Sequence, residues 1–294
     1  MNQMLNTMQN KYIDGKAIAE SVLTEVKADV DDMKTQGIEP CLAVILVGED
    51  AASQVYVQHK VAKAKQVGIR SLEFRFNQDS TTTELLSKID QLNQDPSVHG
   101  ILVQLPLPPQ IDDTQILHKI DPLKDVDGFH RENVGGLSQG QCVLAPCTPM
   151  GCLRLLHETL GSDLSGLHAV IIGRSNIVGK PMAALLLQQH CSVTVVHSRS
   201  KHLAETCQMA DILVATVGQT KLVKADWIKP NAVVIDVGIN RMTVDNQSSL
   251  VGDVDFEDVL PIAQAITPVP GGVGPMTIAY LMKNTLAAAR MQSL

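Results

Sequence analysis

The chain has 294 residues and a formal net charge of −7, and 45% of its residues are hydrophobic. The negative balance argues against nonspecific nucleic-acid binding, and no apolar run reaches the roughly 18 residues that a membrane span needs. The N-terminal residues carry no apolar signal core. We therefore predict a cytoplasmic protein of about two domains that binds neither a membrane nor nucleic acid.

Strand-like and helix-like segments alternate along the whole chain. Runs rich in Val, Ile and Leu predict strands at 41–47, 72–76, 101–105, 169–172, 192–197, 212–216 and 232–237. Helical patterns fall at 15–36, 51–67, 82–94, 149–160, 180–190, 202–209 and 276–292. Near-continuous apolar strands between helices are typical of parallel sheets covered on both faces, so the pattern predicts an α/β fold.

A domain boundary is predicted near residues 145–149. An irregular stretch rich in glycine and proline, 121–144, precedes it, and a fresh strand–turn–helix unit starts at Leu167. We expect two α/β domains, residues 1–147 and 148–275, with the helix 276–294 returning to the first. The second domain should be a Rossmann-like, doubly wound parallel sheet, with an active-site cleft between the two.

The first candidate site lies on the predicted helix 51–67. Ser53, Tyr56 and Lys60 share one stripe of that helix, because positions three and four apart are neighbours. A lysine beside a phenol and a hydroxyl, near the carboxyl end of a strand, suits proton transfer. The plainer interpretation is a solvated lysine next to a half-buried tyrosine.

Two further polar residues follow the next strand and the turn after it. Gln104 ends a strand at the carboxyl edge that launches the helix of Lys60. A carboxylate there would keep the lysine charged, whereas a neutral amide orients it and leaves its pKa free to fall by burial. Asp127 lies in a turn-rich segment, so turn chemistry explains it equally well. Asp125 and Asp127 gain no third ligand in sequence, so no metal is expected.

The six cysteines also give no metal pattern. They form no C-x-x-C pair and lack the paired Cys/His spacing of a zinc site, which predicts free thiols in a reducing compartment.

A phosphate-binding turn is predicted in the second domain. The strand ending at Ile172 runs directly into Gly173, and Gly179 opens a helix, so backbone N–H groups and a positive dipole end face this turn. The spacing G-x-x-x-x-x-G is not the usual dinucleotide fingerprint. Pro181 stands where a Walker A loop has Ser or Thr. Dinucleotide binding and an unliganded turn both stay open.

The next strand indicates which nucleotide is bound. It is followed by Ser198 and Arg199, with no acid before Glu205. An NAD enzyme usually places an Asp or Glu here for the ribose hydroxyl, whereas Ser and Arg suit a 2′-phosphate, so NADP is favoured over NAD. The alternative is a polar turn that happens to be basic. Small residues at the later strand ends, around Gly218 and Ile239, allow a ligand to approach the backbone.

Six motifs occur in an order that resembles a known family. They are YVQHK at 56–60, GILVQLPLP at 100–108, KDVDG at 124–128, PCTP at 146–149, GRSNIVG at 173–179 and PVPGGVGPMT at 268–277. Together they resemble the bifunctional methylenetetrahydrofolate dehydrogenase/methenyltetrahydrofolate cyclohydrolase family from about residue 12 to 290. The resemblance implies two steps at one site: NADP takes a hydride from 5,10-methylenetetrahydrofolate, and water then converts the methenyl cation to 10-formyltetrahydrofolate. It also implies a homodimer.

The resemblance assigns roles to residues. Lys60 is the central catalytic residue, Gln104 positions it and Ser53 supports the group. Tyr56 stacks on the folate and Asp127 binds its pterin ring. Further substrate contacts are Gly272 and Pro275, and the NADP contacts are Gly173, Arg174, Ser175, Thr148, Gly218, Ile239, Ser198 and Arg199.

Three other functional assignments fit parts of this sequence. Tyr-x-x-x-Lys also marks short-chain dehydrogenases, but there the glycine turn precedes the pair, whereas here Tyr56 and Lys60 precede Gly173. A family member could keep only one of the two activities. A non-catalytic NADP- or folate-binding module is the third, and intact Lys60, Gln104 and Asp127 argue against it.

Overall fold

The computed structural model describes residues 11–141, 144–244 and 247–293. These residues form two compact units. The three-stranded unit comprises Glu20–Cys147 and Ile278–Leu294, and the five-stranded unit comprises Thr148–Thr277 with the described residues up to Ala19. The sequence prediction placed residues up to 19 with the first domain, whereas Ile13 donates its N–H to the Ile266 carbonyl at 3.0 Å and so pairs with the five-stranded unit.

The three-stranded unit is built on a parallel sheet in the order β2-β1-β3. β1, Cys41–Val47, is buried along its whole length because it is apolar throughout and lies between the other two strands. β2, Arg70–Phe76, is an edge strand with charged residues on its more exposed side. β3, Gly100–Val103, is fully buried.

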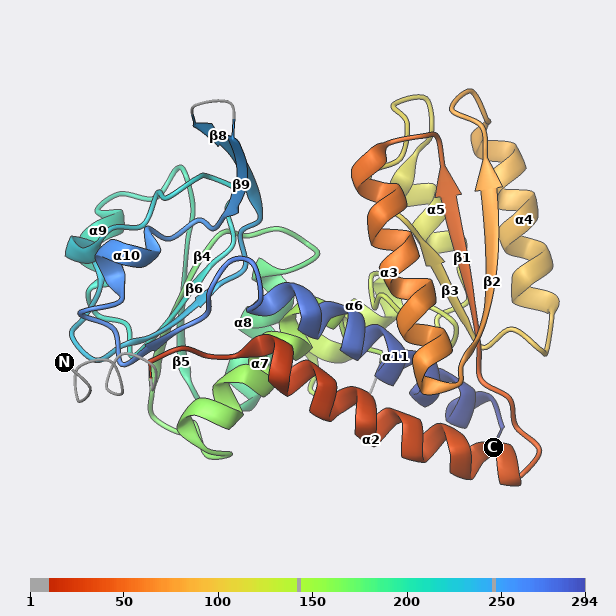
Figure 1. Ribbon diagram of the computed structural model, residues 1–294, viewed down its shortest axis with the longest axis horizontal. Helices are drawn as coiled ribbons and strands as arrows, with labels where there is room; N and C mark the ends of the chain where they lie inside the picture. Colours follow the sequence, from red (N-terminus) through yellow and green to blue (C-terminus); the bar gives the residue numbers. More distant parts are fainter. Residues whose placement is uncertain (1–10, 142–143, 245–246, 294) are drawn as a thin grey trace. The chain divides into compact units, whose positions relative to one another are not determined.

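Four helices of this unit follow these strands. α3 (Ala51–Val67), α4 (Thr82–Gln94), α5 (Asp113–Lys119) and α6 (Arg131–Ser138) are local to it; α3 and α4 lie beside the sheet (Figure 1). Caps fix their ends: Asp50 accepts from the Ser53 N–H at the start of α3, and Thr81 forms a capping box on α4. Buried side chains of α4 join those of β1 and β3 in one core.

The prediction of an irregular stretch over 121–144 is wrong for α6. Gly135 and Gly136 lower the helix propensity of this segment, so the sequence pattern did not predict a helix there. The helix forms because the His130 side chain caps it and Asn133 is buried against the preceding turn.

The five-stranded unit contains a parallel sheet in the order β10-β7-β6-β4-β5. The bounds are β4 His168–Ile172, β5 Ser192–Val196, β6 Ile212–Ala215, β7 Val233–Asp236 and β10 Ala265–Ile266. β5 and β6 lie on opposite sides of β4, so the strand order reverses there. The predicted α/β class and Rossmann-like doubly wound sheet are confirmed.

Helices and a hairpin complete the described chain. They are α7 Cys147–Leu160, α8 Gly179–Gln188, α9 Leu203–Cys207, α10 Phe256–Val259, the 3-10 turn Ala225–Trp227, and the antiparallel pair β8 Asn240–Val244 and β9 Gln247–Val251. The sequence did not predict the hairpin, because its strands are mostly polar. α2 (Gly15–Thr35) and α11 (Val273–Gln292) each contribute residues to both units. Within the described ranges, no helix is long and apolar enough to cross a membrane.

Candidate active site

The Lys60 side chain has a neutral partner at the carboxyl edge of the three-stranded sheet. Its Nζ donates to Gln104 Oε1 at 2.9 Å. Gln104 directly follows β3, and its backbone N–H donates to the Ile45 carbonyl at 2.9 Å. Its Nε2 donates to the Leu105 carbonyl at 2.6 Å, so the amide oxygen is left facing the lysine. The structure therefore brings these two predicted residues together.

Asp127 reaches the same edge along a segment that runs beside β3. Asp125 pairs with Ile101 in parallel, and the Ile101 N–H donates to the Lys124 carbonyl at 2.8 Å. The chain then turns, because the Gly128 N–H donates to the Asp125 carbonyl at 3.0 Å, and Asp127 lies in this turn near enough to Lys60 for the lysine charge to act on it. Nothing in the described chain donates a hydrogen bond to the Asp127 carboxylate, so its acceptor oxygens are left for a ligand.

Burial and charge act in opposite directions on Asp127. The residue keeps some exposed surface, but its carboxyl group lies deep enough that burial raises its pKa to about 6. The nearby Lys60 charge lowers this pKa and Asp125 raises it. A carboxyl group with a pKa near neutrality is ionised under ordinary conditions and sensitive to mild acid.

Ser53 and Tyr56 occupy the same helix as Lys60 but differ in exposure. Ser53 is buried in the first turn of α3, where its N–H donates to Asp50 at 2.8 Å. Tyr56 is 40% exposed, so its ring offers an open apolar surface. Ser53 thus belongs to the helix start, and Tyr56 is the one suited to a stacking contact.

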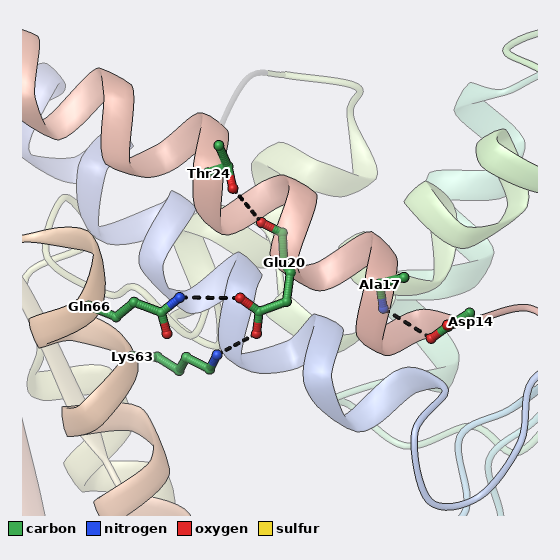
Figure 2. A network of polar contacts seen from close by, with 6 residues as sticks. All are labelled: Asp14, Ala17, Glu20, Thr24, Lys63 and Gln66. Atoms are coloured by element: carbon green, nitrogen blue, oxygen red, sulfur yellow. Dashed lines mark hydrogen bonds and ion pairs between the residues drawn. The ribbon is translucent and has the colours of Figure 1, made fainter.

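Lys63, one turn beyond Lys60, has a different kind of partner. Its Nζ pairs with the Glu20 carboxylate of α2, and Gln66 donates to the other oxygen at 3.2 Å. Figure 2 shows Lys63 and Gln66 converging on Glu20. A carboxylate therefore binds Lys63, while an amide binds Lys60.

Three strand ends meet around Gly173 in the five-stranded unit. The Gly173 N–H donates to the Val196 carbonyl at 2.8 Å, and the Thr216 N–H donates to the Ile172 carbonyl at 2.9 Å. Gly173 has φ +121, and a Cβ there would strike the Thr216 carbonyl. Only glycine lets these chains approach so closely. The turn lies where the strand order reverses, which is the usual ligand position in such sheets.

Ser175 shapes the start of α8. Its Oγ accepts from the N–H groups of Val178 at 3.1 Å and Gly179 at 3.2 Å. The predicted Gly173–Gly179 turn is thus a capped strand-to-helix junction, with Arg174 exposed beside it.

The turn after β5 presents Ser198 and Arg199 to solvent. The His197 N–H donates to Ser200 Oγ at 3.0 Å and the Arg199 N–H donates to His197 Nδ1 at 3.1 Å, which fixes the backbone of this turn. Both Ser198 and Arg199 are exposed, and the part of the chain that the structure describes holds no ion pair to Arg199. Its guanidinium is available to an anionic group.

Asp253 supports the loop after β6 and was not among the residues predicted from the sequence. Its buried carboxylate accepts from the N–H groups of Val217 at 2.6 Å, Gly218 at 3.0 Å and Gln219 at 2.8 Å. The signal in the sequence was weak, because acids in loops are usually exposed. Asp236, at the end of β7, accepts from the Asp253 N–H at 2.9 Å, and burial raises the pKa of its carboxyl to about 7.

The remaining predicted contacts lie in the five-stranded unit. Thr148 Oγ1 is hydrogen-bonded to Thr277 Oγ1 at 2.8 Å. Ile239 is exposed and lies against Gly274. The neighbouring Gly272 is buried, and Pro275 stands in the first turn of α11. Among the described residues, no cluster of His, Cys, Asp and Glu has the makings of a metal site.

Two family models cover this chain. The catalytic-domain model of tetrahydrofolate dehydrogenase/cyclohydrolase matches residues 13–127, and the NAD(P)-binding-domain model of the same family matches residues 146–293. The chain belongs to the tetrahydrofolate dehydrogenase/cyclohydrolase family. The predicted family and the prediction of an enzyme are confirmed.

Relatives and solved structures agree with this assignment. Bifunctional protein FolD 1 from Acinetobacter baylyi is 67% identical over 98% of this chain and 97% of its own. The crystal structure of the bifunctional FolD from Campylobacter jejuni matches with a TM-score of 0.92 and 48% identity over 95% of this chain and 98% of its own. The Trypanosoma brucei FolD, complexed with NADP cofactor and inhibitor, matches with a TM-score of 0.91 and 37% identity over 96% and 98%.

Proposed function

We propose that this family member oxidises 5,10-methylenetetrahydrofolate with NADP and hydrolyses the product to 10-formyltetrahydrofolate. The observation that carries the proposal is the Lys60–Gln104 hydrogen bond, with Asp127 close enough for the lysine charge to lower its pKa. A proton-transferring group, a neutral group that orients it and a carboxylate with no donor among the described residues together suit a nitrogen-rich substrate that is oxidised to a cation and then hydrolysed.

The cofactor side of the proposal rests on the five-stranded unit. Glycine at position 173 lets the ends of β4 and β6 approach closely at the point where the strand order reverses, and the start of α8 offers a positive dipole end to a phosphate. Arg174, Ser175, Thr148, Gly218 and Ile239 would contact the nucleotide, while Ser198 and Arg199 would bind the 2′-phosphate. When bound, NADP supplies the acceptor for the hydride. The NADP in the T. brucei relative supports this choice over NAD.

Asp127 and Tyr56 would hold the folate. The Asp127 carboxylate can accept hydrogen bonds from pterin N–H groups, which become strong when the acceptor is charged and partly buried. The exposed Tyr56 ring would stack on the folate, and Gly272 and Pro275 are the predicted further contacts. These residues orient the one-carbon bridge, and hydride transfer depends mainly on such alignment.

Lys60 would serve the hydrolytic step. Adding water to the methenyl cation and opening the ring requires proton movement at the water oxygen and at a ring nitrogen. Lys60 Nζ is the group positioned for that task, and Gln104 Oε1 orients it without adding a negative charge. Ser53 would act indirectly, by keeping the first turn of α3 in place.

Two finer predictions also belong to this proposal. The family resemblance implies that the protein is a homodimer and works in the cytoplasm as part of one-carbon folate metabolism. Analytical ultracentrifugation of the purified protein tests the assembly.

A turnover assay tests the proposed function. The purified protein is mixed with methylenetetrahydrofolate and either NADP or NAD, and the methenyl absorbance and its decay to the formyl product are followed. We expect both phases, with NADP preferred. Absorbance that rises and never decays would indicate a dehydrogenase alone, and decay of added methenyl compound without oxidation would indicate a cyclohydrolase alone. No change with either cofactor would favour a binding module.

A further inference from the structure

Asn284 joins two backbone segments of the three-stranded unit. It lies on α11 and is buried, with 8% of its surface exposed. Its Nδ2 group donates to the Val126 carbonyl at 2.9 Å and to the Ala145 carbonyl at 2.8 Å. Because an amide nitrogen carries two hydrogens, both are used on these carbonyls. One of the two segments contains the residue next to Asp127.

The two segments also cross at van der Waals distance. Gly128 has φ +72, and a Cβ there would lie 2.6 Å from the Leu144 carbonyl oxygen and from Pro146 N. The Cys147 thiol donates to the Val126 carbonyl at 3.3 Å. Asp127 therefore lies between two fixed residues. The Val126 carbonyl on one side accepts from Asn284 and Cys147, and Gly128 on the other side packs closely against residues 144–146.

This support matters because the Asp127 carboxylate has no donor of its own within the described residues. Neighbouring side chains therefore do not fix it by hydrogen bonds, and its position follows from the backbone on either side. The preceding residues are fixed independently, since the Asp125 carboxylate accepts from the His130 N–H at 2.7 Å and from Asn133 at 2.9 Å. Two amide side chains of α11 bond this segment: Asn284 at Val126, the residue next to Asp127, and Gln292 at Leu123, four residues before it.

We infer that Asn284 is a positioning residue, which sets the place and the burial of the Asp127 carboxylate and thereby the affinity for folate. The inference rests on the proposed function in that Asp127 is taken to bind the pterin ring. Asn284 itself would touch neither the folate nor the cofactor.

Three charged or titratable groups surround Asp127 and have to be considered in any titration. They are Lys60 from α3, Asp125 from its own segment and the Cys147 thiol at the start of α7, whose own pKa is raised well above its usual value by burial and by Asp127. Releasing the segment from Asn284 should admit water to Asp127 and lower its pKa, because burial is the largest cause of its elevation.

The test uses Asn284→Leu, which keeps the shape of the side chain and removes both donors. A control is Gln292→Leu on the same helix, since Gln292 Nε2 donates to two carbonyls that are not adjacent to Asp127 in the chain, those of His99 at 2.8 Å and Leu123 at 3.2 Å. We expect Asn284→Leu to weaken tetrahydrofolate binding by about tenfold or more, to leave NADP binding within about twofold, and to move the carbon-13 NMR titration of Asp127 to lower pH. Gln292→Leu should leave all three unchanged.

Unchanged folate affinity and an unchanged Asp127 titration in Asn284→Leu would overturn the inference, as would equal effects in Gln292→Leu. If Asn284→Leu does not fold, Asn284→Ala, which also removes both donors and adds no bulk, is measured the same way, and wild-type values there would overturn the inference equally. The titration needs no turnover. If the wild-type protein has neither activity, the proposed function is refuted. The NMR titration of Asp127 still tests whether Asn284 positions that carboxylate.

Discussion

Lys60 and Lys63, one turn apart on α3, have hydrogen-bond partners of different charge, and we expect them to have different roles. Lys63 is paired with the Glu20 carboxylate, as Figure 2 shows. Both side chains stay partly exposed, 31% for Lys63 and 47% for Glu20. Lys60 is hydrogen-bonded to the neutral Gln104. A carboxylate partner favours the charged amine and opposes loss of a proton, whereas an amide only orients it. Lys63 thus joins two helices, whereas we propose that Lys60, hydrogen-bonded to an amide, takes part in proton transfer.

Lys60→Met gives the largest expected effect. Removing the amine should slow hydrolysis of the methenyl compound by about 10²- to 10⁴-fold, the usual contribution of a positioned acid or base. Hydride transfer should fall much less, because alignment by Tyr56 and Asp127 is retained. Stopped-flow absorbance of each step on its own substrate measures both rates.

Gln104→Glu gives Lys60 the kind of partner that Lys63 has. We expect hydrolysis at neutral pH to fall by about tenfold to a hundredfold, since the new carboxylate would hold the amine in an ion pair, as Glu20 holds Lys63. Gln104→Asn is the control, because it shortens the side chain without adding charge. A larger loss in Gln104→Asn than in Gln104→Glu would mean that reach, rather than neutrality, is what matters.

Asp127→Asn should weaken folate binding and at the same time raise the free energy of unfolding. Folate affinity in the wild type should weaken as the pH falls through about 6, where the carboxyl group takes up a proton, and the variant should bind weakly at every pH without that transition. The folded-state pKa lies above the ordinary value of 3.8, so ionised Asp127 disfavours folding above about pH 6. The variant should therefore have a higher free energy of unfolding at pH 8, measured in urea.

Arg199→Ala tests which nucleotide the five-stranded unit binds. The change should weaken NADP binding by about tenfold, as for the loss of a charged hydrogen bond, and should leave NAD binding within about twofold. Calorimetric titration with each nucleotide gives the two values. An equal loss for both would show that Arg199 does not contact the 2′-phosphate.

Lys63→Met gives the smallest expected effect. Both activities should stay within about twofold of the wild type. The free energy of unfolding should change by no more than about 1 kcal/mol, because a partly exposed ion pair contributes little. A loss of hydrolysis comparable to that of Lys60→Met would remove the distinction between the two lysines.

The strands and the edge that carries the site could be predicted from sequence because they depend on local patterns. β1 is apolar at all seven positions, and such a strand has to be buried. Lys60 and Gln104 both follow parallel strands, whose carboxyl ends share one edge, so their proximity could be expected.

Features that depend on long-range packing could not be predicted. Asn284 bonds backbone carbonyls far earlier in the chain, and an asparagine in a helix gives no local sign of such partners. Asp253 accepts N–H groups from a loop that precedes it by more than thirty residues. The β8–β9 hairpin has mostly polar strands, and α6 contains two adjacent glycines. Local composition therefore predicted neither element.

The most direct test of the account is the ratio of the hydrolysis rate to the oxidation rate, measured side by side in the wild type, Lys60→Met and Lys63→Met. Each rate is taken in a single turnover, with methenyltetrahydrofolate for hydrolysis and with methylenetetrahydrofolate and NADP for oxidation. The account predicts that the ratio falls by about a hundredfold or more in Lys60→Met and stays within about twofold in Lys63→Met. An unchanged ratio in Lys60→Met, with both rates lowered together, would contradict it.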